Sequence, residues 1–126
     1  LLSKSIMLIQ DGFFFSNKIS TGSIEDFLLS NGLKKFDLAI FDRVLYMLSK
    51  KDIEGLLNKY SKYFKYIIIE DFHSENPRWD SEKYIFAQNY ILILEKYKFS
   101  LLENKVSEMQ SSTASNFARR LLFVSN

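Results

Sequence analysis

The 126-residue sequence contains no cysteine, one histidine, one proline and only four glycines. Without cysteine the chain can form no disulfide bond and offers no thiolate to a metal ion, so it gives no sign of an oxidising compartment. A single histidine also excludes a metal site built from several imidazoles. We therefore expect no metal centre and no covalent cross-link.

The sequence also lacks long apolar segments and a strong excess of charge of one sign. No run approaches the roughly 20 apolar residues of a membrane-spanning helix, and the first residues show no clear cleavable signal. The formal net charge is +2, with lysines and acids interspersed along the chain. Such a distribution does not favour nucleic-acid binding. We expect a soluble, cytoplasmic protein without a membrane span and without a nucleic-acid partner.

The sequence does contain one alternating series of apolar runs and amphipathic segments. Its length suits one domain with one core, which we assign to residues 1–126. The aromatic content is 16%, with twelve Phe and seven Tyr, and we expect most of these rings in the core. The alternation predicts the α/β class.

The firmest prediction is a crossover unit between residues 36 and 71. Residues 36–41 and 66–72 are apolar runs typical of buried strands, and Ser49 with Asp52 gives a helix-start signal between them. The apolar residues of that helix follow a helical period; they are Ile53, Leu56, Leu57, Tyr60 and Phe64. A strand, a helix and a second strand of this length require a parallel pair.

Acidic residues end both predicted strands. Asp42 follows the first run, and Glu70 with Asp71 ends the second. Ligands in open α/β sheets collect outside the carboxyl ends of parallel strands. We therefore expect Asp42 and Glu70 to lie around one shared hollow.

The predictions for the flanking segments are less uniform. Residues 1–10 suit either a helix or the first strand of a hairpin that pairs residues 6–10 with 13–15, and we favour the helix. A strand over 15–21 and a helix from Ile24 to Gly32, capped by Ser23, should follow.

On the C-terminal side, a loop over 73–79 is followed by a predicted long helix from Asp80 to about Lys96. Two final strands, 99–109 and 119–124, should flank a polar segment at 110–116.

The motif F-D-L-A-I-F-D-R-V-L-Y-M-L at residues 36–48 resembles the fourth strand and following turn of class I S-adenosylmethionine (SAM)-dependent methyltransferases. The likeness continues through residues 52–62 and 66–72 and, more loosely, to the chain end. It implies a Rossmann-like, mostly parallel sheet closed by a C-terminal antiparallel hairpin. It also implies SAM as cofactor and a small-molecule methyl acceptor.

The glycine-rich turn with which this family binds the methionine half of the cofactor has no counterpart here, because the chain has no G-x-G run. The resemblance covers what would be the C-terminal two thirds of such a domain, and the sequence begins at Leu1 rather than methionine. We therefore expect a fragment with an incomplete sheet, which binds the cofactor weakly or not at all by itself.

The resemblance implies four cofactor contacts. Residues 22–25 match the turn after strand three, where Ser23 stands at the position of an adenine-binding acid and Ile24 packs on the ring. Asp42 and Arg43 match the turn that lines the cofactor cleft. The alternatives are that Ser23 is only a helix cap and that Asp42 and Arg43 form a surface ion pair. Met47 replaces a frequent histidine of the family, and we expect it in the core.

The remaining candidates concern the methyl acceptor. His73 lies close in sequence to carboxylates, which favour the charged imidazolium, and we assign His73 and Asp71 as the acid–base pair. Glu70 is a candidate substrate anchor, and Arg78 with Trp79 is a candidate lid. The alternatives are a solvated histidine and a tryptophan that only anchors its loop.

A second function class stays open at this point. A noncatalytic α/β module would bind a protein partner, or a second copy, through an incomplete sheet edge and exposed aromatic surface. A homodimer is compatible with both hypotheses.

Overall fold

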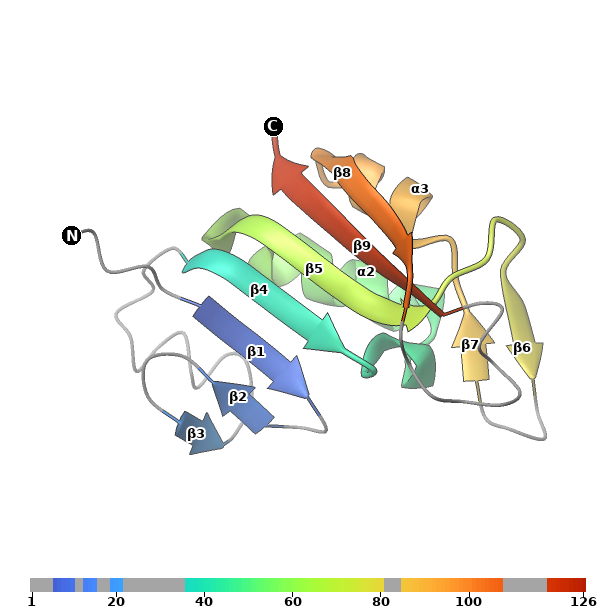
Figure 1. The fold of residues 1–126 in the computed structure, drawn as a ribbon, viewed down its shortest axis with the longest axis horizontal. Coiled ribbons are helices and arrows are strands. Elements are labelled where there is room, and N and C mark those ends of the chain that lie inside the picture. Colours follow the sequence, from blue (N-terminus) through green and yellow to red (C-terminus); the bar gives the residue numbers. More distant parts are fainter. Residues whose placement is uncertain (1–5, 11–12, 16–18, 22–35, 81–84, 108–117) are drawn as a thin grey trace.

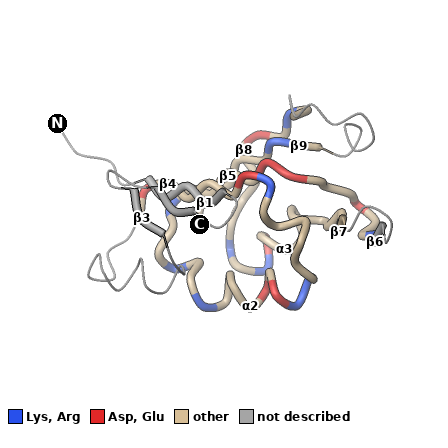
Figure 2. The backbone as a smooth tube through the Cα atoms, turned by 90° about the horizontal axis from the view of Figure 1, so that it is seen from below, with Lys and Arg blue, Asp and Glu red and all other residues tan. Residues whose placement is uncertain are grey.

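The computed structural model describes residues 6–10, 13–15, 19–21, 36–80, 85–107 and 118–126, with side chains from residue 36 onward except that of Asp80. These residues form a seven-stranded sheet of order β3-β2-β1-β4-β5-β9-β8 (Figure 1). Helices α2 and α3 both lie on one face of this sheet (Figure 2).

Parallel strands form the centre of the sheet, and antiparallel strands flank it on both sides. The parallel strands are β1 (Ile6–Gln10), β4 (Phe36–Asp42) and β5 (Phe64–Phe72). The antiparallel strands are β2 (Phe13–Phe15) and β3 (Ile19–Thr21) beside β1, and β9 (Ala118–Ser125) and β8 (Phe99–Val106) beside β5.

The crossover unit between β4 and β5 is confirmed. The 3₁₀ turn η1 (Leu45–Met47), helix α2 (Lys50–Tyr60) and the turn η2 (Ser61–Tyr63) connect the two strands. Ser49 caps α2, because its hydroxyl accepts the Asp52 N–H at 3.2 Å. The expected helix signal therefore acts as a physical cap.

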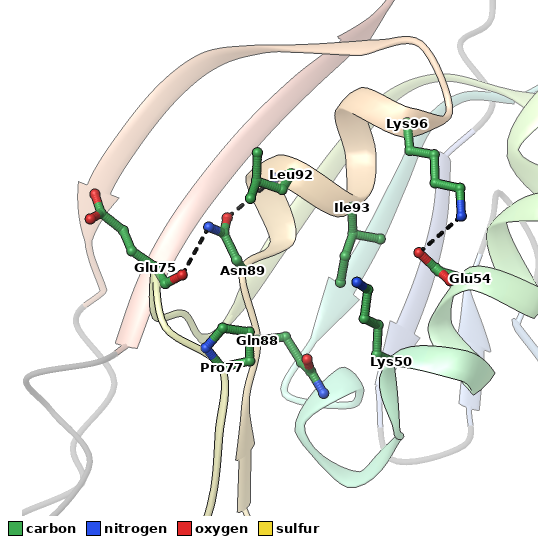
Figure 3. Close-up of a pocket in the computed structure, with 9 residues that line it drawn as sticks. All are labelled: Lys50, Glu54, Glu75, Pro77, Gln88, Asn89, Leu92, Ile93 and Lys96. Carbon is green, nitrogen blue, oxygen red and sulfur yellow. Dashed lines mark hydrogen bonds and ion pairs between the residues drawn. The ribbon is translucent and has the colours of Figure 1, made fainter.

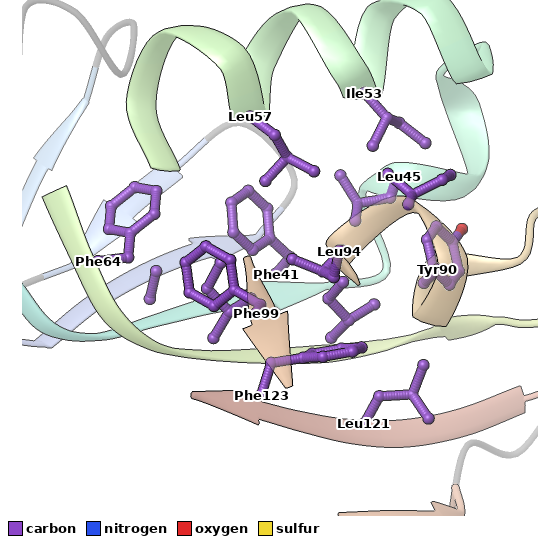
Figure 4. Close-up of a cluster of buried hydrophobic side chains, with 14 of the residues drawn as sticks. Phe41, Leu45, Ile53, Leu57, Phe64, Tyr90, Leu94, Phe99, Leu121 and Phe123 are labelled. Carbon is purple, nitrogen blue, oxygen red and sulfur yellow. The ribbon is translucent and has the colours of Figure 1, made fainter. Parts of the chain in front are cut away.

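The core lies between the sheet and the two helices. Alternate residues of three neighbouring strands face α2 and α3, and their side chains are almost fully buried; they are Ala39, Phe41, Ile67, Ile69, Leu121 and Phe123. Figure 4 shows Ile53 and Leu57 of α2 and Leu94 of α3 pointing into this cluster. The apolar stripe predicted for α2 thus packs on the sheet.

The opposite face of the sheet, which we call the open face, carries apolar side chains that stay partly exposed: Leu38, Ile40, Tyr66, Ile68, Leu122 and Val124. Among the described residues no helix lies over this face (Figure 2). The sheet is therefore covered on one side only by the part of the chain that the structure describes.

The favoured helix over residues 1–10 is wrong. Residues 6–10 form strand β1, which pairs antiparallel with β2 in the register Leu8 to Phe15 and Gln10 to Phe13. The hairpin alternative is therefore the correct one, and β1 also pairs in parallel with β4. The expected strand over 15–21 is replaced by β2 and β3, and the predicted helix from Ile24 to Gly32 lies outside the described residues.

The long helix from Asp80 to Lys96 is also wrong. Residues Arg78–Asp80 and Ile85–Ala87 form the antiparallel ribbon β6–β7, and only Tyr90–Lys96 form helix α3. Asn89 starts that helix, since its side chain accepts the Leu92 N–H at 3.2 Å. The predicted loop position of Arg78 and Trp79 changes accordingly, because both residues belong to β6.

The C-terminal antiparallel hairpin is confirmed, with β8 and β9 paired from Phe99 to Val106 and a β-bulge between Leu101 and Glu103. The fold is thus α/β, with a parallel centre and an antiparallel hairpin at one edge. Within the described ranges, neither helix has the length and apolar character needed to cross a membrane.

Candidate functional site

The carboxyl ends of β1, β4 and β5 meet at one edge of the sheet. Gln10 is the register partner of Asp42, and Asp42 is the register partner of Glu70. The predicted proximity of Asp42 and Glu70 is therefore confirmed. In the strand order, β1 is followed by β2 on one side of the β1–β4 pair, and β4 is followed by β5 on the other side (Figure 1). Such a switch in direction is where α/β sheets leave a crevice for ligands.

Asp42 and Arg43 form an ion pair at this edge. The Arg43 Nε donates to Asp42 Oδ1 at 2.9 Å, and the two side chains are 48% and 20% exposed. Arg43 has a φ of 53°, which is unfavourable for a residue with a Cβ. Its backbone N–H donates to the Glu70 carbonyl at 2.9 Å. The turn after β4 is therefore held in a strained conformation at the edge where ligands are expected.

Glu70 connects β5 to the C-terminal hairpin. Its carboxylate accepts the Ser107 hydroxyl at 2.6 Å and contacts Arg120 at 3.4 Å. Arg120 is the register partner of Glu70, and Lys105 is the register partner of Arg120. Acidic and basic side chains thus follow one another across the end of the open face. A ligand that used Glu70 would have to compete with Ser107 and Arg120.

Asp71 points to the helix-covered side and is fully buried. One carboxylate oxygen accepts the N–H groups of Leu45 at 2.8 Å and Tyr46 at 3.2 Å, and the other accepts the Phe72 N–H at 2.8 Å. Burial raises the pKa of Asp71 to about 6, while these backbone donors act in the opposite direction. The carboxylate fixes the 3₁₀ turn η1 that follows β4. A catalytic role for Asp71 stays a prediction.

His73 is buried against Tyr90 at the start of α3. Its Nδ1 accepts the Tyr90 N–H at 3.3 Å, which leaves the proton of a neutral ring on Nε2. Burial, with Arg119 nearby, lowers the pKa of His73, and Glu75 opposes this only in part. The expectation that neighbouring acids favour the charged ring is therefore wrong, because desolvation has the larger effect.

The Tyr90 hydroxyl is a buried polar group that sequence reasoning did not identify. It has no hydrogen-bond partner among the described residues. Burial and the neighbouring Asp71 carboxylate both raise the pKa of Tyr90, so its hydroxyl stays protonated. Tyr90, Asp71 and His73 therefore form a cluster of buried polar side chains inside an apolar core.

The candidate lid residues lie on the β6–β7 ribbon. Trp79 packs against Phe86 with ring centroids 4.2 Å apart and is 45% exposed. Met47 on η1 is 52% exposed, so its expected place in the core is wrong. Ser23 and Ile24 lie outside the described residues. The structure thus brings Asp42, Glu70 and their neighbours together and leaves the adenine contacts as predictions.

A pocket of about 360 Å³ opens between α2, α3 and the segment that follows β5 (Figure 3). Its walls include Lys50, Pro77, Gln88 and Ile93. Gln88 forms a parallel bridge with His73, and Lys50 is the first residue of α2, so the pocket adjoins the segments that leave the carboxyl edge. No sequence motif pointed to this pocket, because its residues come from distant segments.

No protein-family model matches the sequence, and no curated protein sequence matches it either. Solved structures do match. Over 81% of this chain and 38% of the other, the fold is similar to the mitomycin 7-O-methyltransferase MmcR, with a TM-score of 0.55 and 11% identity.

Two further structures contain the cofactor or its product. The magnesium protoporphyrin IX methyltransferase ChlM of Synechocystis PCC 6803 with bound SAM gives a TM-score of 0.51 and 16% identity over 74% of this chain and 40% of that one. An O-methyltransferase of a Brevibacillus brevis trans-AT PKS multienzyme, in complex with S-adenosyl-L-homocysteine (SAH), gives a TM-score of 0.55 and 8% identity. That match covers 80% of this chain and 53% of the other.

The chain spans about half or less of the length of these structures. The matches agree with a mixed sheet that has parallel strands at its centre and antiparallel strands beside them. Together they show that this chain has the fold of the class I SAM-dependent methyltransferases, in an incomplete form.

Proposed function

We propose that this chain is part of a SAM-dependent methyltransferase that transfers a methyl group to a small molecule. The observation that carries the proposal is the strand order, in which β1, β4 and β5 run parallel and bring Asp42 and Glu70 to one edge. The similarity to methyltransferases solved with SAM or SAH supports the same cofactor.

The cofactor would lie beyond the carboxyl ends of β1 and β4. In this proposal Asp42 would accept hydrogen bonds from the ligand, and its ion pair with Arg43 would limit how much negative charge it presents. In this proposal Ser23 and Ile24 would contact the adenine. Without a G-x-G turn the chain has no glycine cradle for the methionine end, so we expect a dissociation constant of roughly 1 mM, about 4 kcal/mol of binding free energy.

Methyl transfer requires an in-line approach of the acceptor atom to the methyl group and, for some acceptors, removal of a proton. Glu70, Arg78 and Trp79 would contact the acceptor from the end of β5 and from the β6–β7 ribbon. His73 with Asp71 would provide the proton chemistry. Because Nδ1 of His73 accepts a backbone N–H, the exchangeable proton would be the one on Nε2.

The test is a titration of the ¹⁵N-labelled chain with SAH, followed by backbone NMR. We expect chemical-shift changes at Gln10, Asp42 and Arg43. Asp42→Ala should weaken binding about tenfold, since a hydrogen bond to a charged group, worth roughly 1.5 kcal/mol, is lost. Asp37→Ala is the matched control, because Asp37 is an exposed acid near the opposite end of the same strand, and it should bind SAH like the wild type.

Two outcomes would overturn the proposal. The first is the absence of any shift change up to several millimolar SAH, roughly the weakest affinity the proposal allows. The second is a set of changes at the amino ends of β4 and β5, with equal effects of Asp42→Ala and Asp37→Ala.

The open face favours a second candidate, a noncatalytic module that binds a protein partner or a second copy. Six apolar side chains stay partly exposed there, and such a surface is commonly buried by association. Sedimentation velocity over a range of concentrations tests this function. A dimer that dissociates in the Ile68→Lys variant, together with no response to SAH, would favour the module over the enzyme.

A further inference from the structure

We propose that the pocket between α2 and α3 binds a small carboxylic acid, whose carboxylate contacts Lys50 and Gln88. This site is distinct from the cofactor site proposed at the ends of β1 and β4. The binding inference does not depend on the proposed methyltransferase function. Only the identification of this acid as the methyl acceptor would rest on that function.

Gln88 provides the first observation. The residue is 3% exposed, and its side-chain amide makes no hydrogen bond to any other residue that the structure describes. Its backbone is held in place, because its carbonyl accepts the Ser74 N–H at 3.0 Å and the residue bridges to His73. This amide lines the pocket and is not among the fully buried polar atoms without a partner, so its donor and acceptor face the pocket, where a ligand can reach them.

Lys50 provides the second observation. Its ammonium lines the same pocket and pairs with no acid among the described residues. The other lysine of the pocket, Lys96, is already paired with Glu54 at 3.3 Å. Figure 3 shows that pair on the opposite side of the pocket from Gln88. The Lys50 and Gln88 side therefore offers N–H donors and positive charge.

The rest of the pocket sets the shape of the ligand. Pro77, Leu92 and Ile93 provide apolar wall, and Asn89 is occupied by the Leu92 N–H and the Glu75 carbonyl (Figure 3). The Glu75 carboxylate points away from the other side chains in the same view. A volume of about 360 Å³ suits a molecule of one ring with a short polar group. A carboxylate accepts from both donors, and an apolar body covers the wall.

Benzoate is a suitable probe, and neutral benzamide is its matched control. In ¹⁵N NMR titrations of the full chain without SAH, we expect benzoate to shift Lys50, Gln88 and Ile93 with roughly millimolar affinity. Benzamide should bind about tenfold more weakly, because it lacks the charge that Lys50 recognises.

Variants assign the two donors. Lys50→Met should weaken benzoate about tenfold, whereas Lys51→Met, next to it on α2 and outside the pocket wall, should leave the affinity unchanged. Gln88→Leu should also weaken benzoate but leave the thermal midpoint nearly unchanged, because the amide that it removes makes no hydrogen bond to another described residue. A loss of binding without a loss of stability is the signature of a binding residue.

The inference is overturned if benzoate shifts no pocket resonance at concentrations well above the expected dissociation constant. It is also overturned if Lys50→Met and Lys51→Met bind benzoate equally, or if Gln88→Leu lowers the thermal midpoint without changing the affinity. Because SAH is absent, loss of benzoate binding and loss of SAH binding are separate results.

Discussion

The two faces of the sheet differ sharply although the same strands build both. On the helix-covered face, Phe41, Ile69 and Leu121 are neighbours in register and are at most 2% exposed. On the open face, Ile40 and Ile68, one residue away in each strand, stay partly exposed. Composition therefore does not separate the faces, since both carry large apolar residues.

What separates the faces is the layer that covers them. Helices α2 and α3 bury the residues of β4, β5 and β9 on one face, whereas no described helix lies over the other (Figure 2). Strands of a parallel sheet are apolar on both sides because both faces are normally covered. The open face thus has the sequence of a buried surface. Each prediction below tests this contrast.

The largest effect should come from two adjacent isoleucines of β5. Ile69→Ala should lower the free energy of unfolding by about 2–5 kcal/mol, because it leaves a cavity in a packed core. Ile68→Ala should cost roughly 1 kcal/mol, since the side chain is already partly in contact with water. Urea denaturation of both variants measures the difference. Equal losses would show that the open face is covered in solution.

The second prediction compares the adjacent carboxylates Asp71 and Glu70. The pKa of Asp71 is raised from 3.8 in the unfolded chain to about 6 in the folded chain. The protonated carboxyl group therefore contributes its full stability below pH 3.8, and this contribution is lost as the pH rises to about 6. Relative to Asp71→Asn, the wild type should lose on the order of 3 kcal/mol over this interval. Denaturation curves at several pH values measure this difference.

Glu70→Gln is the control for the open face. Its partners Ser107 and Arg120 are retained and the group is partly exposed, so the change should cost less than about 1 kcal/mol. His73 has the opposite effect on the pH dependence of stability. Because its pKa is lowered in the folded state, its contribution to stability is lost as the pH falls below 6.5. The comparison with Asp71→Asn cancels that contribution. A flat difference between wild type and Asp71→Asn would contradict the assignment.

The third prediction concerns the strained turn at the ligand edge. Arg43→Gly should be about 1 kcal/mol more stable than Arg43→Ala, because only glycine adopts a φ of 53° without a Cβ penalty. Both variants lose the ion pair with Asp42, so their difference isolates the backbone. Thermal melts of the two variants suffice, and equal midpoints would remove strain from the account.

The smallest effect should come from the helix layer itself. Nothing lies within 4 Å of a Cβ built on Gly55 in α2, so Gly55→Ala should raise the free energy of unfolding by about 0.5–1 kcal/mol. The gain should appear as a later midpoint in urea. A loss of stability would mean that α2 packs more closely at this position than the structure shows.

The sequence predicted the features that depend on local pattern. The apolar runs of β4 and β5 and the Ser49 cap of α2 are local signals, and the crossover they specify forces Asp42 and Glu70 together. The N-terminal hairpin was only the second alternative, because the spacing of Leu2, Ile6 and Ile9 fits a helix as well. The pairing of β1 with β2 and β4 decides between the two.

The features that the sequence did not predict depend on contacts between distant segments. Asp71 binds backbone N–H groups of Leu45 and Tyr46, some 25 residues earlier, and no motif marks such an acceptor. The ribbon β6–β7 replaces a helix because Trp79 stacks on Phe86 and Asn89 starts α3 late. The pocket that contains Lys50 and Gln88 forms only where α2, α3 and the segment after β5 come together, and no local pattern predicts that arrangement.

The central claim is that the cofactor binds at the carboxyl edge of the sheet, and a spin label tests it most directly. The chain has no cysteine, so Arg120→Cys places one label at that edge and Lys65→Cys places one near the opposite end of β5. We predict that the label at 120 broadens the proton signals of SAH far more than the label at 65. Equal broadening, or stronger broadening from position 65, would contradict the account.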